Sequence, residues 1–359
     1  MTKVAITRLT LPRGVLAAGL AAALFGASTP GAKVLVGEIP PVMLAGLLYA
    51  GAGFGLALVI GLRHVFARDG ARLQLPARKD LPWLAAAILV GGVLGPVLLM
   101  VGLRTTPAGS ASLLLNMEAV FTALIAWFVF REHFDRRIAL GMLLIVAGGL
   151  VLSYEPDAAF VVSQGALTIA AACACWALDN NFTRRISAND ASLIACIKGL
   201  AAACVNLGIA LVLGQALPDA AHLVGACAVG FLGYGVSLAL FVYALRHLGT
   251  ARSSAYFSSA PFFGVLLAVV ALGEPVTPAL VVAGALIGAG VWLHLTERHA
   301  HEHDHLPMEH AHPHAHDEHH RHEHDFEWDG SQPHTHRHRH ERLIHSHPHY
   351  PDLHHRHKH

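Results

Sequence analysis

The chain of 359 residues is 54% hydrophobic and only 14% charged, with a formal net charge of +1. A soluble domain of this length usually carries about a quarter charged residues, so this deficit indicates a membrane protein. Charged residues are sparse up to about Leu295, whereas 23 of the 28 histidines lie between His299 and His359. No phosphate loop, nucleotide fingerprint or nucleophile elbow occurs. The sequence therefore predicts neither an enzyme nor a nucleic-acid-binding protein, and no cofactor is required.

Ten segments approach the length of about 20 mostly apolar residues that a helix needs to cross a bilayer. They cover residues 14–36, 41–62, 81–103, 107–130, 138–153, 165–183, 191–213, 222–245, 250–272 and 276–295. None shows the polar face that a soluble helix would present at helical period. The basic residues Lys3, Arg8 and Arg13 resemble the start of a signal peptide. Because the following apolar run extends beyond a typical signal core, we expect the first span to be retained.

The loops between these segments predict the orientation of the chain. With a cytoplasmic N-terminus, the inside segments carry 15 Lys and Arg residues and the outside loops carry two. This excess favours a multi-pass protein of the bacterial inner membrane with its N-terminus in the cytoplasm. Because the number of spans is even, the C-terminal tail is expected on the same side.

An internal repeat is the most specific structural pattern. The stretch Gly102–Phe134 aligns without gaps with Ala244–Val276, which places Arg104 on Arg246. The loop count puts these two arginines on opposite sides of the membrane. The two copies are therefore expected to run in opposite directions through the bilayer.

A second aligned stretch lies upstream, where "FGASTPGAK" (Phe25–Lys33) matches "WALDNNFTR" (Trp176–Arg184). Each unit then holds five spans, and an odd number of spans inverts the second copy relative to the first. Inverted repeats form a pseudo-twofold bundle whose central site can open to either side in turn. Such symmetry favours a transporter, with a channel or a receptor as alternatives.

Two helix endings carry a resemblance to a known family. "WFVFREHF" contains Glu132, "VVALGEPV" contains Glu274, and each precedes a glycine-rich helix. Together with "CWALDNNFTRRI", these stretches resemble the EamA-type branch of the drug/metabolite transporter superfamily over residues 14–296. Where the commoner pattern has a proline, the first half has Glu118-Ala119, whereas the second half keeps Pro261. The resemblance implies secondary transport of small organic solutes, often export of amino acids or metabolites, and leaves the His-rich tail unexplained.

The predicted fold is an all-α integral membrane protein of ten transmembrane helices, arranged as two inverted five-helix repeats and followed by a disordered His-rich tail. The predicted parts are a cytoplasmic N-terminus (1–13), the two repeats (14–153 and 165–296) and the tail (297–359). A bilayer and a small-molecule solute are the expected partners, and the sequence leaves open a homodimer.

Glu118 is the sharpest candidate for a functional residue, because it lies near the middle of its span and an ionisable group there is costly without a partner. It could bind substrate or carry a proton, since burial disfavours the charged form of a carboxyl. The alternative is a structural glutamate that holds two helices together. Thr122 lies one turn further on the same face, and Asn116 is a polar neighbour on another face.

The sixth span supplies further candidates. Trp176 and Asn180 are one turn apart, and a ring beside an amide could line a solute site. Asp179 is interpreted instead as a boundary residue that forms a charge pair with Arg184 or its neighbour Arg185. Lys198, in the seventh span, either extends to the inner surface or neutralises Glu118.

Glu132 and Glu274 end their helices at opposite surfaces and are interpreted as structural groups that lock loops. The ninth span has an unusually polar first half, in which Tyr256 and Ser258 are candidate lining residues. Hydroxyl groups bonded to helical carbonyls explain that half almost as well.

The tail has no apolar periodicity and is expected to be disordered and to bind a divalent transition metal whose identity the sequence does not specify. The candidate ligands are His310, His312, His314, His316, His319, His320, His322, His324, His334, His336, His338 and His340. Three functions compete. The first is a solute carrier with a metal-binding appendage, the second a nickel, cobalt or zinc transporter whose tail collects the ion, and the third a metal or pH sensor without transport. Few metal ligands lie at mid-membrane, so the first is preferred.

Overall fold

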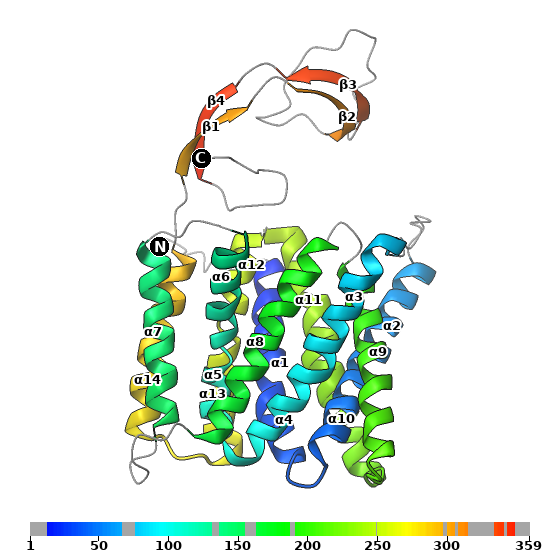
Figure 1. The fold of residues 1–359 in the computed structure, drawn as a ribbon, viewed down its shortest axis with the longest axis vertical. Helices are drawn as coiled ribbons and strands as arrows, with labels where there is room; N and C mark the ends of the chain where they lie inside the picture. Colours follow the sequence, from blue (N-terminus) through cyan, green and yellow to red (C-terminus); the bar gives the residue numbers. More distant parts are fainter. Residues whose placement is uncertain are drawn as a thin grey trace, which may run out of the picture. The chain divides into compact units, whose positions relative to one another are not determined.

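The computed structural model describes residues 13–66, 76–130, 136–154, 163–186, 191–248, 250–296, 300–305, 308–314, 334–340 and 343–348. It divides into two compact units, Met1–Thr296 and Glu297–His359. The first unit is entirely helical in its described part and carries the long apolar segments (Figure 1). It is the part of the molecule that contains the candidate site.

The first half of this unit contains α1 (Arg13–Leu35), α2 (Pro41–Phe66), the 3₁₀ helix η1 (Arg78–Asp80), α3 (Leu81–Ala87), the π-helix η2 (Ile88–Leu94), α4 (Gly95–Thr105), α5 (Ala108–Leu114), α6 (Met117–Phe130) and α7 (Arg136–Ser153). The second half contains α8 (Gln164–Arg185), α9 (Ala191–Val212), α10 (Ala220–Gly230), the π-helix η3 (Phe231–Val236), α11 (Ser237–Leu248), α12 (Thr250–Phe257), α13 (Ala260–Leu272) and α14 (Pro278–Leu295).

Nine helical stretches in the described part of the chain are long and apolar enough to cross a bilayer. The tenth expected span is α8, which is 22 residues long but more polar, because Asp179, Asn180 and Asn181 lie in its second half. The structure confirms the predicted all-α membrane fold with two inverted five-helix repeats. Because each repeat has five spans, α1 and α8 run in opposite directions.

The packing of the helices follows the repeat. The second helices of the two halves, α2 and α9, pack on each other, as do the fifth helices, α7 and α14 (Figure 1). The first helix of each half instead packs into the other half: α1 contacts α11 and α13, and α8 contacts α4 and α6. The two halves are therefore interlocked around α1 and α8 and form a single unit.

Small residues allow these close contacts, as expected where lipid gives helices no hydrophobic reason to associate. Ala18, Ala21 and Ala22 of α1 are completely buried. Gly26 also lies in this face, and a Cβ atom there would overlap the backbone oxygen of Ala260 at the start of α13. This face of α1 therefore has side chains small enough for the backbone of a neighbouring helix to come close.

Each third span contains a π-helical segment, and the two segments occupy equivalent positions. Residues 88–94 and 231–236 overlap in the same alignment register that places Arg104 on Arg246. A π segment leaves backbone carbonyls without their ordinary helical partners and is frequent at functional sites. In the first half, Gly95 and Pro96 follow it at once, and a proline in the first turn of a helix has no N–H to lose.

Each fourth span is broken in the middle. The break lies at Leu115 and Asn116 between α5 and α6, and at Ser258 and Ser259 between α12 and α13. The predicted spans 107–130 and 250–272 are present, but the sequence analysis did not anticipate the interruption inside each of them. In the second half Pro261 follows the break, whereas the first half has Ala119 at that position. A proline alone therefore does not explain the interruption.

The tail contains four short strands, β1 (Ala300–His305), β2 (Met308–His314), β3 (His334–His340) and β4 (Leu343–Pro348). β1 pairs antiparallel with β4, and β2 pairs antiparallel with β3. The expectation of disorder did not include these strands. Alternating H-x-H sequence is compatible with an extended backbone, although two-stranded ribbons are only marginally stable by themselves.

Candidate functional site

A cavity of about 780 Å³ lies between the two halves. Its wall is formed by both broken fourth spans, by the first helix of each half, and by parts of α2, α4, η3 and α14. The aromatic residues of the wall are Phe25, Tyr49, Trp176, Tyr234 and Phe257. Its polar residues are Ser28, Thr29, Asn116, Glu118, Thr122, Asn180, Asn181, Ser258 and His294.

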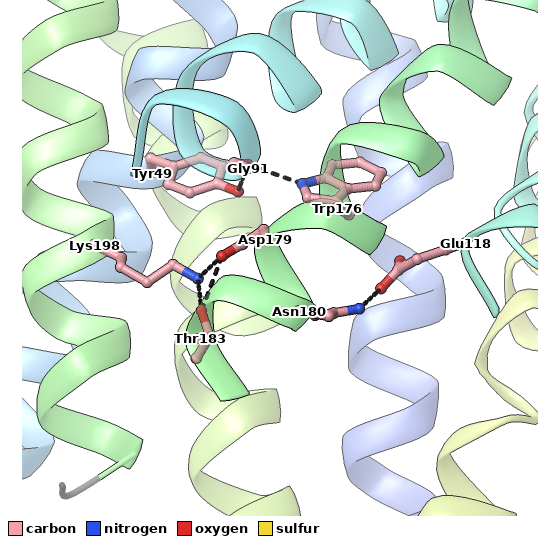
Figure 2. A network of polar contacts seen from close by, with 8 residues as sticks. All are labelled: Tyr49, Gly91, Glu118, Trp176, Asp179, Asn180, Thr183 and Lys198. Carbon is pink, nitrogen blue, oxygen red and sulfur yellow. Dashed lines mark hydrogen bonds and ion pairs between the residues drawn. The ribbon is translucent and has the colours of Figure 1, made fainter. Parts of the chain in front are cut away.

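Glu118 lies in the first turn of α6, directly after the break, and lines the cavity. The side-chain amide of Asn180 donates from Nδ2 to Glu118 Oε1 at 2.7 Å (Figure 2). Trp176 and Asn180 both belong to the wall, as the sequence predicted. Because α6 and α8 come from different repeats, the contact between Glu118 and Asn180 joins the two halves across the site.

Asp179 belongs to a separate polar cluster on another side of α8. Figure 2 shows Asp179 directed toward Lys198 on α9, whereas Asn180 is directed toward Glu118. Lys198 Nζ lies 2.5 Å from Asp179 Oδ1, and the Thr183 hydroxyl donates to the same oxygen at 2.9 Å. Successive helical residues are about 100° apart, so neighbouring side chains of α8 reach different helices.

This cluster corrects the prediction for Lys198 and adds a partner for Asp179. Lys198 neutralises Asp179, whereas the sequence left it either extending to the surface or neutralising Glu118. Asp179 pairs with Lys198, a partner that the sequence interpretation did not name. The side chains of Arg184 and Arg185 lie outside the described residues. The sequence spacing favoured the neighbouring arginines. The contact with Lys198 depends instead on η2, which packs against both α9 and α8.

The carbonyl oxygen of Gly91, inside the π segment η2, accepts two side-chain hydrogen bonds. Trp176 Nε1 donates to it at 2.9 Å and the Tyr49 hydroxyl at 3.2 Å (Figure 2). A Cβ atom on Gly91 would overlap the carboxylate of Asp179. The π segment thus fixes two rings of the cavity wall on one face and receives the charged cluster on the other.

The second half repeats this arrangement with other side chains. Gly233, which aligns with Gly91 in the repeat, packs against Ser28, and a Cβ atom on Gly233 would approach the Ser28 Cβ to 2.6 Å. Ser28 aligns with Asp179 in the repeat, and Phe25 aligns with Trp176. Phe25 and Trp176 therefore line the cavity at equivalent positions, whereas Ser28 lines it and its counterpart Asp179 does not.

The other predicted lining residues have different outcomes. Asn116, Thr122 and Ser258 line the cavity, and the buried hydroxyl of Thr122 has no hydrogen-bond partner among the described residues. The Ser258 hydroxyl donates to the Ser254 carbonyl oxygen at 2.9 Å, so both interpretations of the polar ninth span hold there. Tyr256 is not part of the wall and is 40% exposed, which corrects that prediction. Successive helical residues are about 100° apart, so Tyr256 points to another side of α12 than the lining Phe257.

Glu274 holds the beginning of α5. Its two carboxylate oxygens accept hydrogen bonds from the backbone N–H groups of Ala108 at 2.6 Å and Gly109 at 2.8 Å. A carboxylate at a helix N-terminus is favoured by the helix dipole. Glu274 therefore fastens a loop, in agreement with the sequence interpretation, while Glu132 lies outside the described residues.

Lys33 holds the neighbouring end of α4. Its Nζ donates to the carbonyl oxygens of Leu103 at 2.5 Å and Thr106 at 2.9 Å. A cation at a helix C-terminus is favoured by the same dipole. The short turn between α4 and α5 is thus held by one charge of each sign at this end of the bundle.

The predicted metal ligands of the tail are placed only in part. His310, His312 and His314 lie on β2, and the strand register sets them opposite His338, His336 and His334 of β3. His340 is opposite Met308. The candidates from residue 316 to residue 324 lie outside the described part of the chain. Within that part, no group of three or more His, Cys, Asp or Glu residues could hold a metal ion.

Sequence reasoning missed several residues of the wall, namely Phe25, Tyr49, Tyr234, Phe257 and His294. The alignment of Phe25 with Trp176 in the repeat could have identified the first of these. Tyr49 and Tyr234 lie in largely apolar runs, where a ring that faces lipid and a ring that faces the cavity have the same sequence context.

Comparison with known proteins gives the chain its family. The EamA-like transporter family matches residues 12–154 and 163–296. An uncharacterized transporter of Methanothermobacter thermautotrophicus is 30% identical over 282 residues, which cover 75% of this chain and 82% of that protein. A "Probable terminal-alkyne amino-acid exporter" of Streptantibioticus cattleyicolor is 28% identical over 255 residues, covering 70% of this chain and 86% of that protein.

A solved crystal structure has the same fold. It is 21% identical in sequence, covers 78% of this chain and 95% of its own, and superposes with a TM-score of 0.58. The two family matches coincide with the two five-helix halves that surround the cavity. The chain therefore belongs to the EamA-like transporter family, and each half is one copy of the family's domain.

Proposed function

We propose that the protein is a secondary transporter that exports a small solute, such as a metabolite or an amino acid, by alternating access. It acts in the bacterial inner membrane, with both termini in the cytoplasm. The name of the Streptantibioticus relative, an amino-acid exporter, supports this class of cargo. The Lys and Arg excess of the predicted inside loops supports the orientation.

The observation that carries the proposal is the position of the cavity. It lies on the boundary between the two halves and is lined by the broken middle of each fourth span. In inverted-repeat carriers, solute sites lie at the repeat interface near interrupted helices, and one repeat rocks against the other. The two halves contribute equivalent positions to the wall, so the same site could be exposed to either side in turn.

The test is solute counterflow with the full chain in proteoliposomes, using a panel of radiolabelled amino acids. A carrier gives saturable flux and exchange, whereas a channel gives flux that rises linearly with concentration. Ala119→Trp, which fills the cavity at a lining position, is expected to abolish the flux. Leu143→Trp is the matched control, because Leu143 is 65% exposed on the outside of the bundle. Saturable flux that Ala119→Trp leaves intact would place the pathway elsewhere.

The orientation has its own test. Reporter fusions after Arg104 and after Arg246 are expected to report opposite sides of the membrane, with Arg246 on the cytoplasmic side. Reporters on a common side would contradict the inverted topology and with it the alternating-access mechanism.

The tail is proposed to bind a divalent transition metal and to act as a cytoplasmic appendage of the carrier. The 23 histidines between His299 and His359 support metal affinity, since neutral imidazole is a common ligand for such ions. Deleting residues 297–359 is expected to abolish high-affinity binding of Ni²⁺ or Zn²⁺ in calorimetry and to leave saturable solute flux in place. Loss of cellular metal accumulation on deletion, with no effect on solute flux, would favour a transported cation.

A further inference from the structure

The cavity wall holds a carboxylate that no lysine or arginine of the wall balances. Among the described lining residues, Glu118 is the one aspartate or glutamate, none is lysine or arginine, and the ring of the lining His294 is bonded through Nε2 to the Ile138 carbonyl oxygen at 3.2 Å. Lys198 lies behind the wall and is already bound to Asp179. An ionised group at this depth is expensive unless a partner of opposite charge is nearby. The site therefore favours a positive charge brought by a ligand.

The hydrogen bond from Asn180 orients Glu118 without neutralising it. The amide donates to Oε1 at 2.7 Å, and no hydrogen bond from the described residues reaches Oε2. An amide is uncharged, whereas an ammonium group supplies both donors and charge, and charge-assisted hydrogen bonds are about twice as strong as neutral ones. One carboxylate oxygen, Oε1, is thus bonded to the protein, and the other, Oε2, is available to a ligand.

Four aromatic rings line the same cavity as this carboxylate. The ring centroids of Phe25 and Phe257 are 5.1 Å apart, those of Phe25 and Tyr234 5.9 Å, and those of Tyr49 and Tyr234 6.1 Å. They form a continuous row that both halves contribute to. Aromatic faces attract ammonium groups and also pack well against apolar portions of a solute.

We infer that the cavity selects solutes that carry a protonated amine, with Glu118 as the counter-ion and the aromatic row as the surface for the rest of the molecule. The inference rests on the proposed transport function and names the chemical class of its cargo. Organic anions without an amine are excluded by the same carboxylate, because like charges in a site of low polarity repel strongly.

The test compares three probes that share a phenyl ring and differ in charge: phenethylamine, 2-phenylethanol and 3-phenylpropionate. Binding is measured by calorimetry on the full chain in lipid nanodiscs. We expect the amine to bind about ten-fold or more tightly than the alcohol, since a hydrogen bond to a charged group contributes that much. The acid is expected to bind most weakly.

Glu118→Gln is expected to remove the advantage of the amine and to keep the affinity for the alcohol, which also shows that the variant is folded. Glu118→Asp, which keeps the charge, should retain a preference for the amine. Asp219→Asn is the matched control, because the same change is made on an exposed residue outside the cavity. Equal affinity of the wild-type protein for amine and alcohol, or an amine preference that survives in Glu118→Gln, overturns the inference.

These outcomes are separable from the transport proposal. Saturable amino-acid flux without any amine preference would leave the carrier in place and remove only the role of Glu118. A Glu118-dependent amine preference without saturable flux would leave the binding site in place and remove the carrier.

Discussion

The two halves of the molecule have the same backbone irregularities and different polar side chains. Both have a π segment in the third span and a break in the fourth, at positions that nearly coincide when the repeats are aligned. The second half, however, has Asp179 bonded to Lys198, whereas the first half has Ser28 at the position aligned with Asp179. Backbone features that shape the cavity are thus duplicated, while the charged cluster belongs to one half. The comparison indicates that the shape of the site comes from the repeat and its chemistry from later divergence of each copy.

The starts of the third spans differ in the same way. In the second half, Asp219 caps α10 by accepting hydrogen bonds from the backbone N–H groups of Ala221 and His222. The equivalent residue of the first half is Ala77, and η1 begins there without a side-chain cap. The second half therefore depends more on polar side chains than the first, and the following changes test that difference.

The largest effect is expected from Lys198→Met. It leaves Asp179 buried without its partner, and breaking a buried ion pair in this way costs about 3–5 kcal/mol of unfolding free energy. Denaturant or thermal unfolding in mixed micelles measures the loss. Adding Asp179→Ser to Lys198→Met removes the unpaired charge, introduces the residue that the first half has at that position, and is expected to recover most of the loss. Lys79→Met on the exposed turn η1 is the control, and a loss no larger than in this control would show that the pair is not structural.

Substitution of the π-segment glycines is expected to have an intermediate effect. Gly91→Ala pushes a methyl group into the Asp179 carboxylate and Gly233→Ala pushes one toward Ser28, and such overpacking costs about 1–3 kcal/mol. Gly91→Ala is expected to cost more than Gly233→Ala, because the ion pair with Lys198 fixes the Asp179 side chain that the new methyl group would meet. Gly61→Ala meets no atom within 4 Å and serves as the control. Equal, negligible effects at all three glycines would argue against close packing at the π segments.

A smaller effect is expected from Glu274→Gln. The carboxylate bonds two N–H groups at the start of α5, and replacing its charge at a helix N-terminus costs about 1 kcal/mol. Glu132 is the aligned residue of the first half. If it caps a helix as Glu274 does, Glu132→Gln is expected to cost a similar amount of unfolding free energy. Glu38→Gln on an exposed loop residue is the control. A loss of stability in Glu274→Gln but not in Glu132→Gln would show that the two halves also differ in this loop contact, in addition to the Asp179–Lys198 pair.

The smallest effect is a pH dependence confined to the start of α10. The hydrogen bond from His222, and then those from backbone N–H groups, lower the pKa of Asp219 below its ordinary value. Because this pKa is lowered in the folded state, the cap stabilises the helix fully above the ordinary carboxyl range, and its contribution is lost as the pH falls through the lowered value. Amide exchange of Ala221 and His222 is expected to quicken relative to the rest of α10 in acid. The uncapped start at Ala77 should show no such change.

The sequence by itself determined the membrane class, the ten spans, the repeat and the family, because these depend on apolar run length, loop charge and self-similarity, which are all written along the chain. It also identified Glu118, Trp176 and Asn180, since polar groups in an apolar span are conspicuous. The tertiary structure alone decided which partner each group meets. Lys198 reached Asp179 because η2 packs against both α8 and α9, and Tyr256 lies outside the cavity wall because successive residues of α12 point to different sides of the helix. The aromatic row was likewise decided by packing, since contacts between distant segments leave no periodic trace in a uniformly apolar sequence.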